Sequence, residues 1–190
     1  MIANAAGGVT TSRRKRYYEL AARIRVPLGF LILALYAAFA RPSPVRLAVG
    51  AAAALGGLVL RGVAAGHLAK NHRLATSGPY AYTRNPLYLG SATAGLGFAV
   101  AGGLWWLALL LAGYLLAIFL PVVAEEESHL EKLFPEFRAY AQIVPRFWPV
   151  RGRVFPSSER FRWSLYWRNQ EYNALLAYLF GIGLLLWKLH

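Results

Sequence analysis

The chain contains no cysteine and no aspartate, so all of its acidic side chains are glutamates. Without cysteine, disulfide bonds, thiolate nucleophiles and cysteine-ligated metal sites are excluded. The glutamates are also unevenly placed, because seven of the eight lie between Glu125 and Glu171. No secretory signal is expected, since the basic run at 13–16 precedes an apolar segment that lacks a clear small-residue cleavage site.

The net charge of +13 is a strong excess of basic residues. Such a charge can indicate nucleic-acid binding, but here the basic residues are spread over several loops, without a compact domain to present them. At 57% hydrophobic residues the chain is also too apolar for an ordinary soluble domain. We therefore expect no nucleic-acid partner and attribute the charge to membrane topology.

The apolar residues fall into runs that predict an all-α, polytopic integral membrane protein with about five transmembrane helices. The expected apolar helices cover about 26–40, 45–68, 86–101, 104–123 and 172–189. The first is short for a span at ~1.5 Å per residue. Pro121 is expected to kink or end the fourth helix. An amphipathic segment, 125–143, follows and is interrupted at Phe134 and Pro135.

The distribution of basic residues predicts the orientation. Residues 1–25 and 67–85 are rich in Lys and Arg, whereas the opposite loops contain only Arg41 and Arg46. The positive-inside rule then places the N-terminus and the polar segments in the cytoplasm and the C-terminus outside. We expect one membrane domain over 1–190, with a flexible basic tail at 1–16, in what the composition suggests is a bacterial inner membrane.

The segment Gly78–Gly90, GPYAYTRNPLYLG, is polar and stands between apolar runs. Pro86 suits the first turn of a helix, where exposed backbone N–H groups can take a carboxylate or a ribose. Arg84 adds a planar donor fork, and the tyrosines offer flat faces to an adenine ring or a sulfonium. The alternative is a membrane-interface loop with an aromatic belt and a snorkelling arginine.

A second polar segment, Glu125–Pro149, begins directly after a span. On a helix, consecutive glutamates point ~100° apart, so one of Glu125–Glu127 can face inward and bind a ribose, an ammonium or Arg84. The alternative is a charged helix start. Val144–Arg146, with Trp148, predicts a rigid lid or strap, or else an aromatic interface anchor. Arg61, inside the second span, either snorkels or pairs with a buried glutamate.

Other catalytic patterns are missing. The histidines do not show a metal-ligand spacing, so we expect no metal site. No serine has the partners of a hydrolase triad, and no glycine-rich nucleotide loop occurs.

Taken together, residues 66–149 resemble the isoprenylcysteine carboxyl methyltransferase / phospholipid methyltransferase family of integral membrane enzymes. The family pattern is GPY-x-x-x-R-[HN]-P-x-Y-x-G, then E-E-x-x-L, then F-x-x-[YF]-x-x-Y-x-x-x-V-P-R. The second and third parts are matched here by Glu126, Glu127, Leu130, Phe134, Phe137, Tyr140, Val144, Pro145 and Arg146. The chain departs from the family at Asn85, where many members have His, and at Phe134-Pro135, where many have Phe-Gly.

The resemblance implies S-adenosylmethionine-dependent methylation of a lipophilic acceptor at the membrane surface, in a cytosol-facing C-terminal pocket. The acceptor classes left open are a prenylcysteine-like carboxylate, a phospholipid amine and another small hydrophobic substrate. Arg84, Glu127 and Arg146 are the implied catalytic residues. The implied cofactor-binding residues are Gly78, Pro79, Tyr80, Tyr82, Arg84, Asn85, Pro86, Tyr88, Gly90, Glu126 and Glu127. The alternatives are an NADPH-dependent, sterol-reductase-like membrane enzyme and a non-catalytic membrane scaffold.

Overall fold

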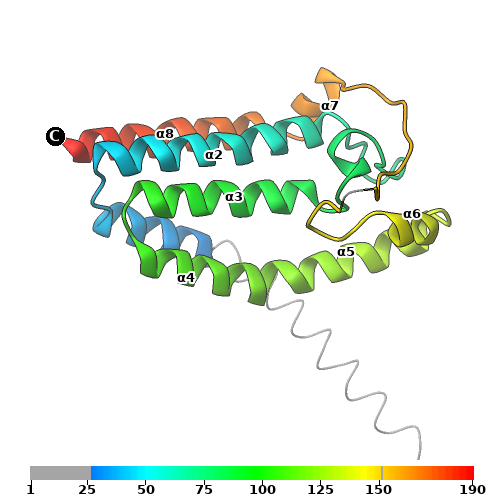
Figure 1. The fold of residues 1–190 in the computed structure, drawn as a ribbon, viewed down its shortest axis with the longest axis horizontal. Helices are drawn as coiled ribbons and strands as arrows, with labels where there is room; N and C mark the ends of the chain where they lie inside the picture. The colour runs from blue at the N-terminus through cyan, green and yellow to red at the C-terminus, as the bar shows by residue number, and fades with distance from the viewer. Residues whose placement is uncertain (1–26, 151) are drawn as a thin grey trace, which may run out of the picture.

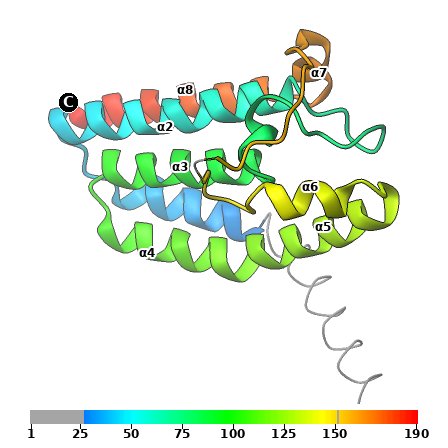
Figure 2. The ribbon, with the colours of Figure 1, turned by 45° about the vertical axis from the view of Figure 1, so that its right-hand side comes forward.

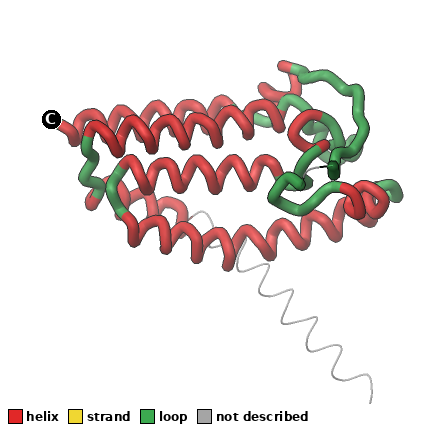
Figure 3. Tube along the Cα trace, viewed as in Figure 1, coloured by secondary structure: helices red, strands yellow, loops and turns green. Residues whose placement is uncertain are grey.

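The computed structural model describes residues 27–150 and 152–190, and the regular structure in these residues is helical, without a strand (Figure 3). The all-α prediction is therefore confirmed for this part of the chain. The α-helices are Pro27–Phe39, α2 (Pro44–Ala65), α3 (Pro86–Ala101), α4 (Trp105–Tyr114), α5 (Leu120–Leu133), α6 (Phe137–Ile143), α7 (Trp163–Arg168) and α8 (Tyr172–Leu189). A 3-10 turn, η1 (Gly78–Ala81), and a π-helical turn, η2 (Leu115–Phe119), complete the described elements.

Within residues 27–150 and 152–190, three helices are long and apolar enough to cross a membrane: α2, the continuous helix Trp105–Leu133, and α8. Helix Pro27–Phe39 and α3 are apolar but shorter. Large apolar side chains on these helices point outward; Val45 and Trp187, for example, are 74% and 73% exposed. Water would oppose so much exposed apolar surface, whereas a lipid bilayer accommodates it. These features are those of an integral membrane protein.

Helices α2 and α3 pack closely because glycines face each other along their contact. A Cβ built on Gly57 would lie 2.5 Å from the carbonyl oxygen of Gly90, and one on Gly97 would lie 2.5 Å from the backbone nitrogen of Ala54. Both distances are impossible for a real side chain. Small residues let helix backbones approach closely in lipid, where the hydrophobic effect does not drive helices together.

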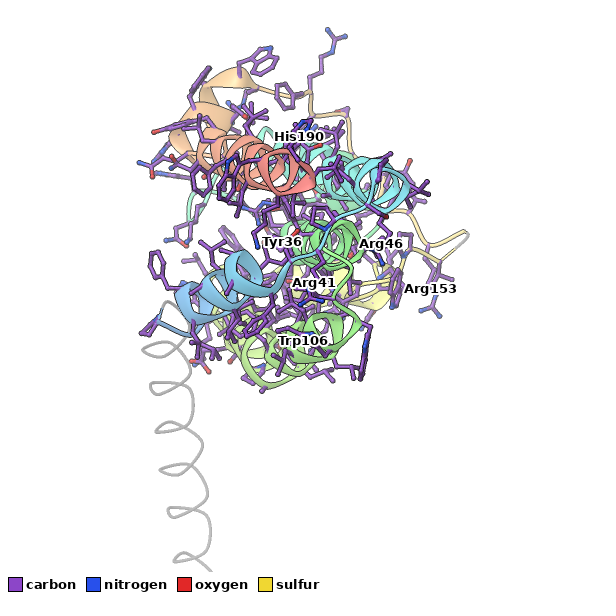
Figure 4. All side chains as sticks on the ribbon, turned by 90° about the vertical axis from the view of Figure 1, so that its left-hand side faces the viewer. Tyr36, Arg41, Arg46, Trp106, Arg153 and His190 are labelled. Carbon is purple, nitrogen blue, oxygen red and sulfur yellow. The ribbon has the colours of Figure 1, made fainter. Side chains whose placement is uncertain are left out.

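The helices run roughly antiparallel, so their connections gather at two ends (Figure 1). The long connections, 66–85 and the described residues 144–150 and 152–162, lie together at one end with the short turn 134–136, and α6 folds back along α5 (Figures 2 and 3). The short turns at 40–43 and 102–104 lie at the other end, where Arg41, Arg46, Trp106 and His190 are found (Figure 4). The two polar segments therefore share one end of the bundle.

The helix does not end at Pro121, so that part of the prediction is wrong. Immediately before the proline, the backbone N–H of Leu120 donates to the carbonyl of Leu115, which is the π-helical pattern. Proline has no N–H to donate, and the wider turn absorbs this interruption of the hydrogen-bond ladder. The helix then continues to Leu133 and carries the glutamates beyond the apolar region. The predicted interruption at Phe134 and Pro135 is confirmed, because α6 begins only at Phe137.

Candidate functional site

A cavity of about 280 Å³ opens at the end of the bundle that holds the long connections. One wall is the 68–75 segment, and another is the chain from Tyr80 through the first turn of α3. The remaining walls come from α5 and α6. The cavity therefore brings together the two polar segments, which are about 40 residues apart in the sequence.

Glu127 is the centre of the charged network beside this cavity. Its side chain is 9% exposed, and Oε1 lies 3.2 Å from Nη1 of Arg84. Oε2 accepts hydrogen bonds from Arg146, at 3.0 Å from Nε and 2.6 Å from Nη2. The amide nitrogen of Asn85 donates to Oε1 at 3.2 Å. A buried carboxylate that accepts from this many donors holds the groups around it in place.

Val144–Arg146 forms a strap across the first polar segment. The backbone N–H of Arg84 donates to the carbonyl of Pro145 at 2.9 Å. The carbonyl of Arg146 accepts from Thr83 Oγ1 at 3.2 Å and from Asn85 Nδ2 at 3.1 Å. The strap thus fixes the backbone before α3, while Trp148 just beyond it is 75% exposed.

Two buried tyrosines support the base of the cavity. The hydroxyl of Tyr140, on α6, donates to the carbonyl of Tyr80 at 2.7 Å. Burial raises the pKa of both hydroxyl groups above the ordinary value, so both stay protonated. Tyr140 also packs with Phe137 and Val144 in a small apolar core. This core joins α6 and the strap into one support for the site.

Glu126 differs from its neighbour because it is exposed on α5. Its Oε2 accepts a hydrogen bond from the hydroxyl of Tyr88 at 3.1 Å. The Tyr88 ring in turn makes an edge contact with Phe119, at 5.1 Å between centroids. Glu126 and Tyr88 therefore form an accessible polar rim, whereas Glu127 lies inside.

The structure brings most of the predicted site residues to this region. Those that line the cavity are Tyr80, Arg84, Asn85, Pro86, Tyr88, Glu126 and Glu127. Arg146 lines an adjoining cavity of about 460 Å³, which shares Arg84 and Glu127 as wall residues.

Four predicted residues line neither of these two cavities: Gly78, Pro79, Tyr82 and Gly90. Gly78 has a φ of 57° and lies against the ring of His67, where a Cβ would be 2.6 Å from that ring. Gly90 packs against Gly57 and Arg61. These two glycines therefore serve the backbone turn and the helix contact.

Other lining residues were not predicted as site residues: Lys70, Asn71, Arg73, His129 and Tyr140. The segment that contains the first three was used only for the orientation argument. The basic residues of this segment could have indicated that it lines the site, because a cationic loop next to an arginine-containing motif can contribute to the same site. Among the described residues, no cluster of three or more potential metal ligands occurs.

A separate cavity of about 390 Å³ lies among the apolar helices. Its walls come from helix Pro27–Phe39 and from α2, α3, α4 and α8. They are apolar apart from a few groups, among them Arg61 and Ser91. The first turn of α3 therefore lies between a polar cavity at the bundle end and an apolar cavity among the helices.

Comparison with known proteins supports the resemblance seen in the motifs. Residues 46–136 match the family model described as phospholipid methyltransferase. The chain is 38% identical over 81 residues to the cobalt-zinc-cadmium resistance protein CzcN of Cupriavidus metallidurans, covering 42% of this chain and 37% of that protein. It is 37% identical over 93 residues to the nickel-cobalt-cadmium resistance protein NccN of Alcaligenes xylosoxydans xylosoxydans, covering 48% and 43%.

The chain thus spans less than half the length of the curated relatives it matches. No solved structure matches the chain. The predicted resemblance to the membrane methyltransferase family is confirmed by the family model, which covers most of α2 and all of α3, α4 and α5.

Proposed function

Because residues 46–136 match the phospholipid methyltransferase family, we propose that the protein is an S-adenosylmethionine-dependent methyltransferase with a lipophilic acceptor. The observation that carries the proposal is the convergence of Arg84, Asn85 and Glu127 on one cavity at the bundle end. In a bilayer, the chain would cross about five times, with this end in the cytoplasm. A polar methyl donor would then arrive from water and the acceptor from lipid.

The residues of the cavity fit the proposed cofactor chemically. The Nε–H of Arg84 is buried and has no hydrogen-bond partner, so it is a donor available to a ligand oxygen. Lys70 offers a cation to a carboxylate, whereas Arg73 is already paired with Glu159, and the Tyr88 ring offers a face to a sulfonium. The volume of about 280 Å³ is close to the ~300 Å³ lower bound for small-molecule sites.

The bound cofactor would supply an electrophilic methyl group, and the chain supplies orientation and exclusion of water. Glu127 holds Arg84 and Arg146 in place, and its oxygens already accept from three side chains. Glu126 is the accessible carboxylate of the pair. We propose Glu126 as the group that takes a proton from an amine acceptor, whereas a carboxylate acceptor would need only the arginines.

The apolar cavity among the helices supports a lipophilic acceptor. It offers a hydrocarbon chain a largely apolar wall within the apolar part of the bundle. The N-terminal part of α3 contributes to both cavities, with Leu87 lining the polar cavity and Ser91 lining the apolar one. An amphiphile whose chain lies among the helices can therefore present its head group near this part of α3.

The test is a titration calorimetry experiment with the full chain in lipid nanodiscs, using S-adenosylmethionine and, in parallel, NADPH. We expect saturable binding of S-adenosylmethionine, weakened about tenfold or more, ~1.4 kcal/mol, by Arg84→Ala. Arg138→Ala is the control, because Arg138 is 79% exposed, pairs with Glu131 and lines the adjoining cavity but not the cavity proposed for the cofactor.

Equal weakening by both arginine variants would refute the assignment of the cavity. Binding of NADPH alone would favour a sterol-reductase-like enzyme, and binding of neither would favour a scaffold. If S-adenosylmethionine binds, transfer of labelled methyl groups to lipid amines, prenylcysteine carboxylates and hydrophobic thiols would identify the acceptor class.

A further inference from the structure

A buried ion pair joins α2 to the start of α8, outside the cofactor cavity. Nε and Nη2 of Arg61 donate to the two carboxylate oxygens of Glu171, at 3.1 and 2.6 Å. Glu171 is 8% exposed and Arg61 25%. The arginine therefore does not reach outward as a snorkelling residue; the alternative of a buried glutamate partner is the correct one.

The remaining nitrogen of Arg61 reaches the first turn of α3. Nη1 donates to Ser91 Oγ at 2.5 Å and to the carbonyl of Leu87 at 3.4 Å. Ser91 Oγ donates to the same carbonyl at 2.8 Å. The guanidinium thus binds Glu171 through one edge and the backbone of α3 through another, so three helices meet at one side chain.

This turn of α3 is also a wall of the cofactor cavity. Asn85, immediately before the helix, donates to Glu127, and Tyr88, within the turn, donates to Glu126. Leu87 lines the cavity as well. A shift of this turn along the helix axis, or a rotation about that axis, would therefore move the groups that we propose to contact the cofactor.

The packing leaves Arg61 little freedom. A Cβ at Gly90 would lie 2.7 Å from Cγ of Arg61, so the stem of the arginine passes α3 at a point where only glycine leaves room. Buried ion pairs are often neutral or unfavourable for stability compared with well-packed apolar residues, because both charges lose their hydration. Such a pair is better explained by the geometry it imposes than by the free energy it contributes.

We propose that Arg61, held by Glu171, is a positioning residue that sets the first turn of α3 for cofactor binding. The inference rests on the proposed methyltransferase function for its binding readout. It also makes a structural claim that needs no cofactor, namely that the pair holds the backbone of residues 86–91 in place.

The experiment uses the full chain in nanodiscs with Arg61→Met, which keeps an unbranched stem without the charge, and Arg61→Lys, which keeps the charge. Lys188→Met is the matched control. Lys188 also joins two helices, because it donates to the carbonyls of Ala38 and Ala40, but it does so at the opposite end of the bundle.

Two readouts are measured for each variant: the Kd for S-adenosylmethionine and amide hydrogen exchange over residues 86–91. We expect Arg61→Met to raise the Kd about tenfold or more and to speed exchange in this turn. Arg61→Lys should recover part of both effects, since it restores the cation opposite Glu171. Lys188→Met should leave both readouts at their wild-type values.

A purely structural anchor predicts a different pattern: a lower melting temperature with the Kd and the local exchange unchanged. That result would overturn the proposal. If the wild-type chain does not bind S-adenosylmethionine, the proposed function fails by itself. The positioning claim is then decided by amide hydrogen exchange alone. Faster exchange confined to residues 86–91 in Arg61→Met would support it, and exchange there at the wild-type rate would overturn it.

Discussion

Glu126 and Glu127 are adjacent glutamates with different surroundings. Glu127 faces the bundle, where two arginines and an asparagine donate to it. Glu126 is exposed and accepts from Tyr88. The difference arises because consecutive residues on a helix point ~100° apart, and only Glu127 faces the strap. In the proposed mechanism, Glu127 orients and Glu126 takes part in proton transfer.

We predict that Glu127→Gln lowers the free energy of unfolding by roughly 1–3 kcal/mol, because the buried arginine Arg84 loses its counter-charge. The same change should weaken S-adenosylmethionine binding. Thermal unfolding in detergent and calorimetry would measure the two effects. Glu125→Gln is the control, since Glu125 is exposed on the same helix. Identical behaviour of the two variants would contradict the central role of Glu127.

At the scale of elements, the contact between α2 and α3 depends on which glycine faces the partner helix. Gly57 lies against Gly90, whereas the neighbouring Gly56 has open space where a Cβ would go. Since α3 begins at the cavity that we propose for the cofactor, this contact also helps to place the candidate site. The structure therefore shows that Gly57 lies in the helix contact and Gly56 does not, a difference that the sequence alone does not reveal.

Gly57→Val should accordingly destabilise the protein strongly, by roughly 3 kcal/mol or more, because the new side chain would overlap the α3 backbone. Gly56→Val should stay within about 0.5 kcal/mol, as expected of an outward-facing substitution. The measurement is thermal unfolding of both variants in the same detergent. A wild-type melting temperature for Gly57→Val would show that the helices do not pack as described.

His67 supports the 66–85 connection at the same end. Its Nδ1 lies 2.8 Å from Oγ of Ser77, and its ring lies against Gly78. Burial lowers the pKa of this histidine, with Arg73 contributing in the same direction and Glu159 opposing it. The folded protein thus holds His67 neutral at a pH where the unfolded chain is already protonated.

Stability should therefore fall as the pH drops below the ordinary histidine value of ~6.5, since the unfolded chain then binds more protons than the folded chain. The loss should level off below the lowered pKa of the folded state. Melting temperatures between pH 8 and pH 5 would measure this slope, and His67→Gln should reduce it. An unchanged slope in that variant would assign the acid sensitivity to other groups.

For the whole molecule, the proposed function depends on the separation of an apolar outer surface from one charged end. Apolar side chains cover the outside of the helices, and the arginine–glutamate network is confined to one end. The opposite end carries little charge, with Arg41 and Arg46 among its few charged residues (Figure 4). In the proposed function, a site at the charged end receives a water-soluble donor, and the apolar cavity among the helices takes the hydrocarbon part of the acceptor.

The absence of cysteine makes the proposed orientation directly measurable. Single cysteines at Ser157, on the site end, and at Ser43, on the opposite end, should react with a membrane-impermeant maleimide from opposite sides of the membrane. In intact cells, we expect labelling of Ser43→Cys alone; in inverted vesicles, of Ser157→Cys alone. Labelling of both positions from one side would exclude an odd number of crossings between them.

The apolar helices and the two polar segments of the candidate site can be read from the sequence. Apolar runs predicted helix bounds to within a few residues, because lipid allows few backbone arrangements other than helices; the exception is the helix expected at 104–123, which continues to Leu133. The motif residues from Tyr80 to Tyr88 and the Glu126–Glu127 pair carried enough chemistry to predict one shared cavity, and seven of them line it.

Only the tertiary structure decided which of these groups face one another. The partner of Arg61 is 110 residues away, so no local pattern could identify it. The wall at 68–75 joins the site because the chain folds back after α2, and the helix continues past Pro121 because a π-helical turn absorbs the missing hydrogen bond. Local sequence sets which side chains a helix carries, whereas packing among distant segments sets which of them meet.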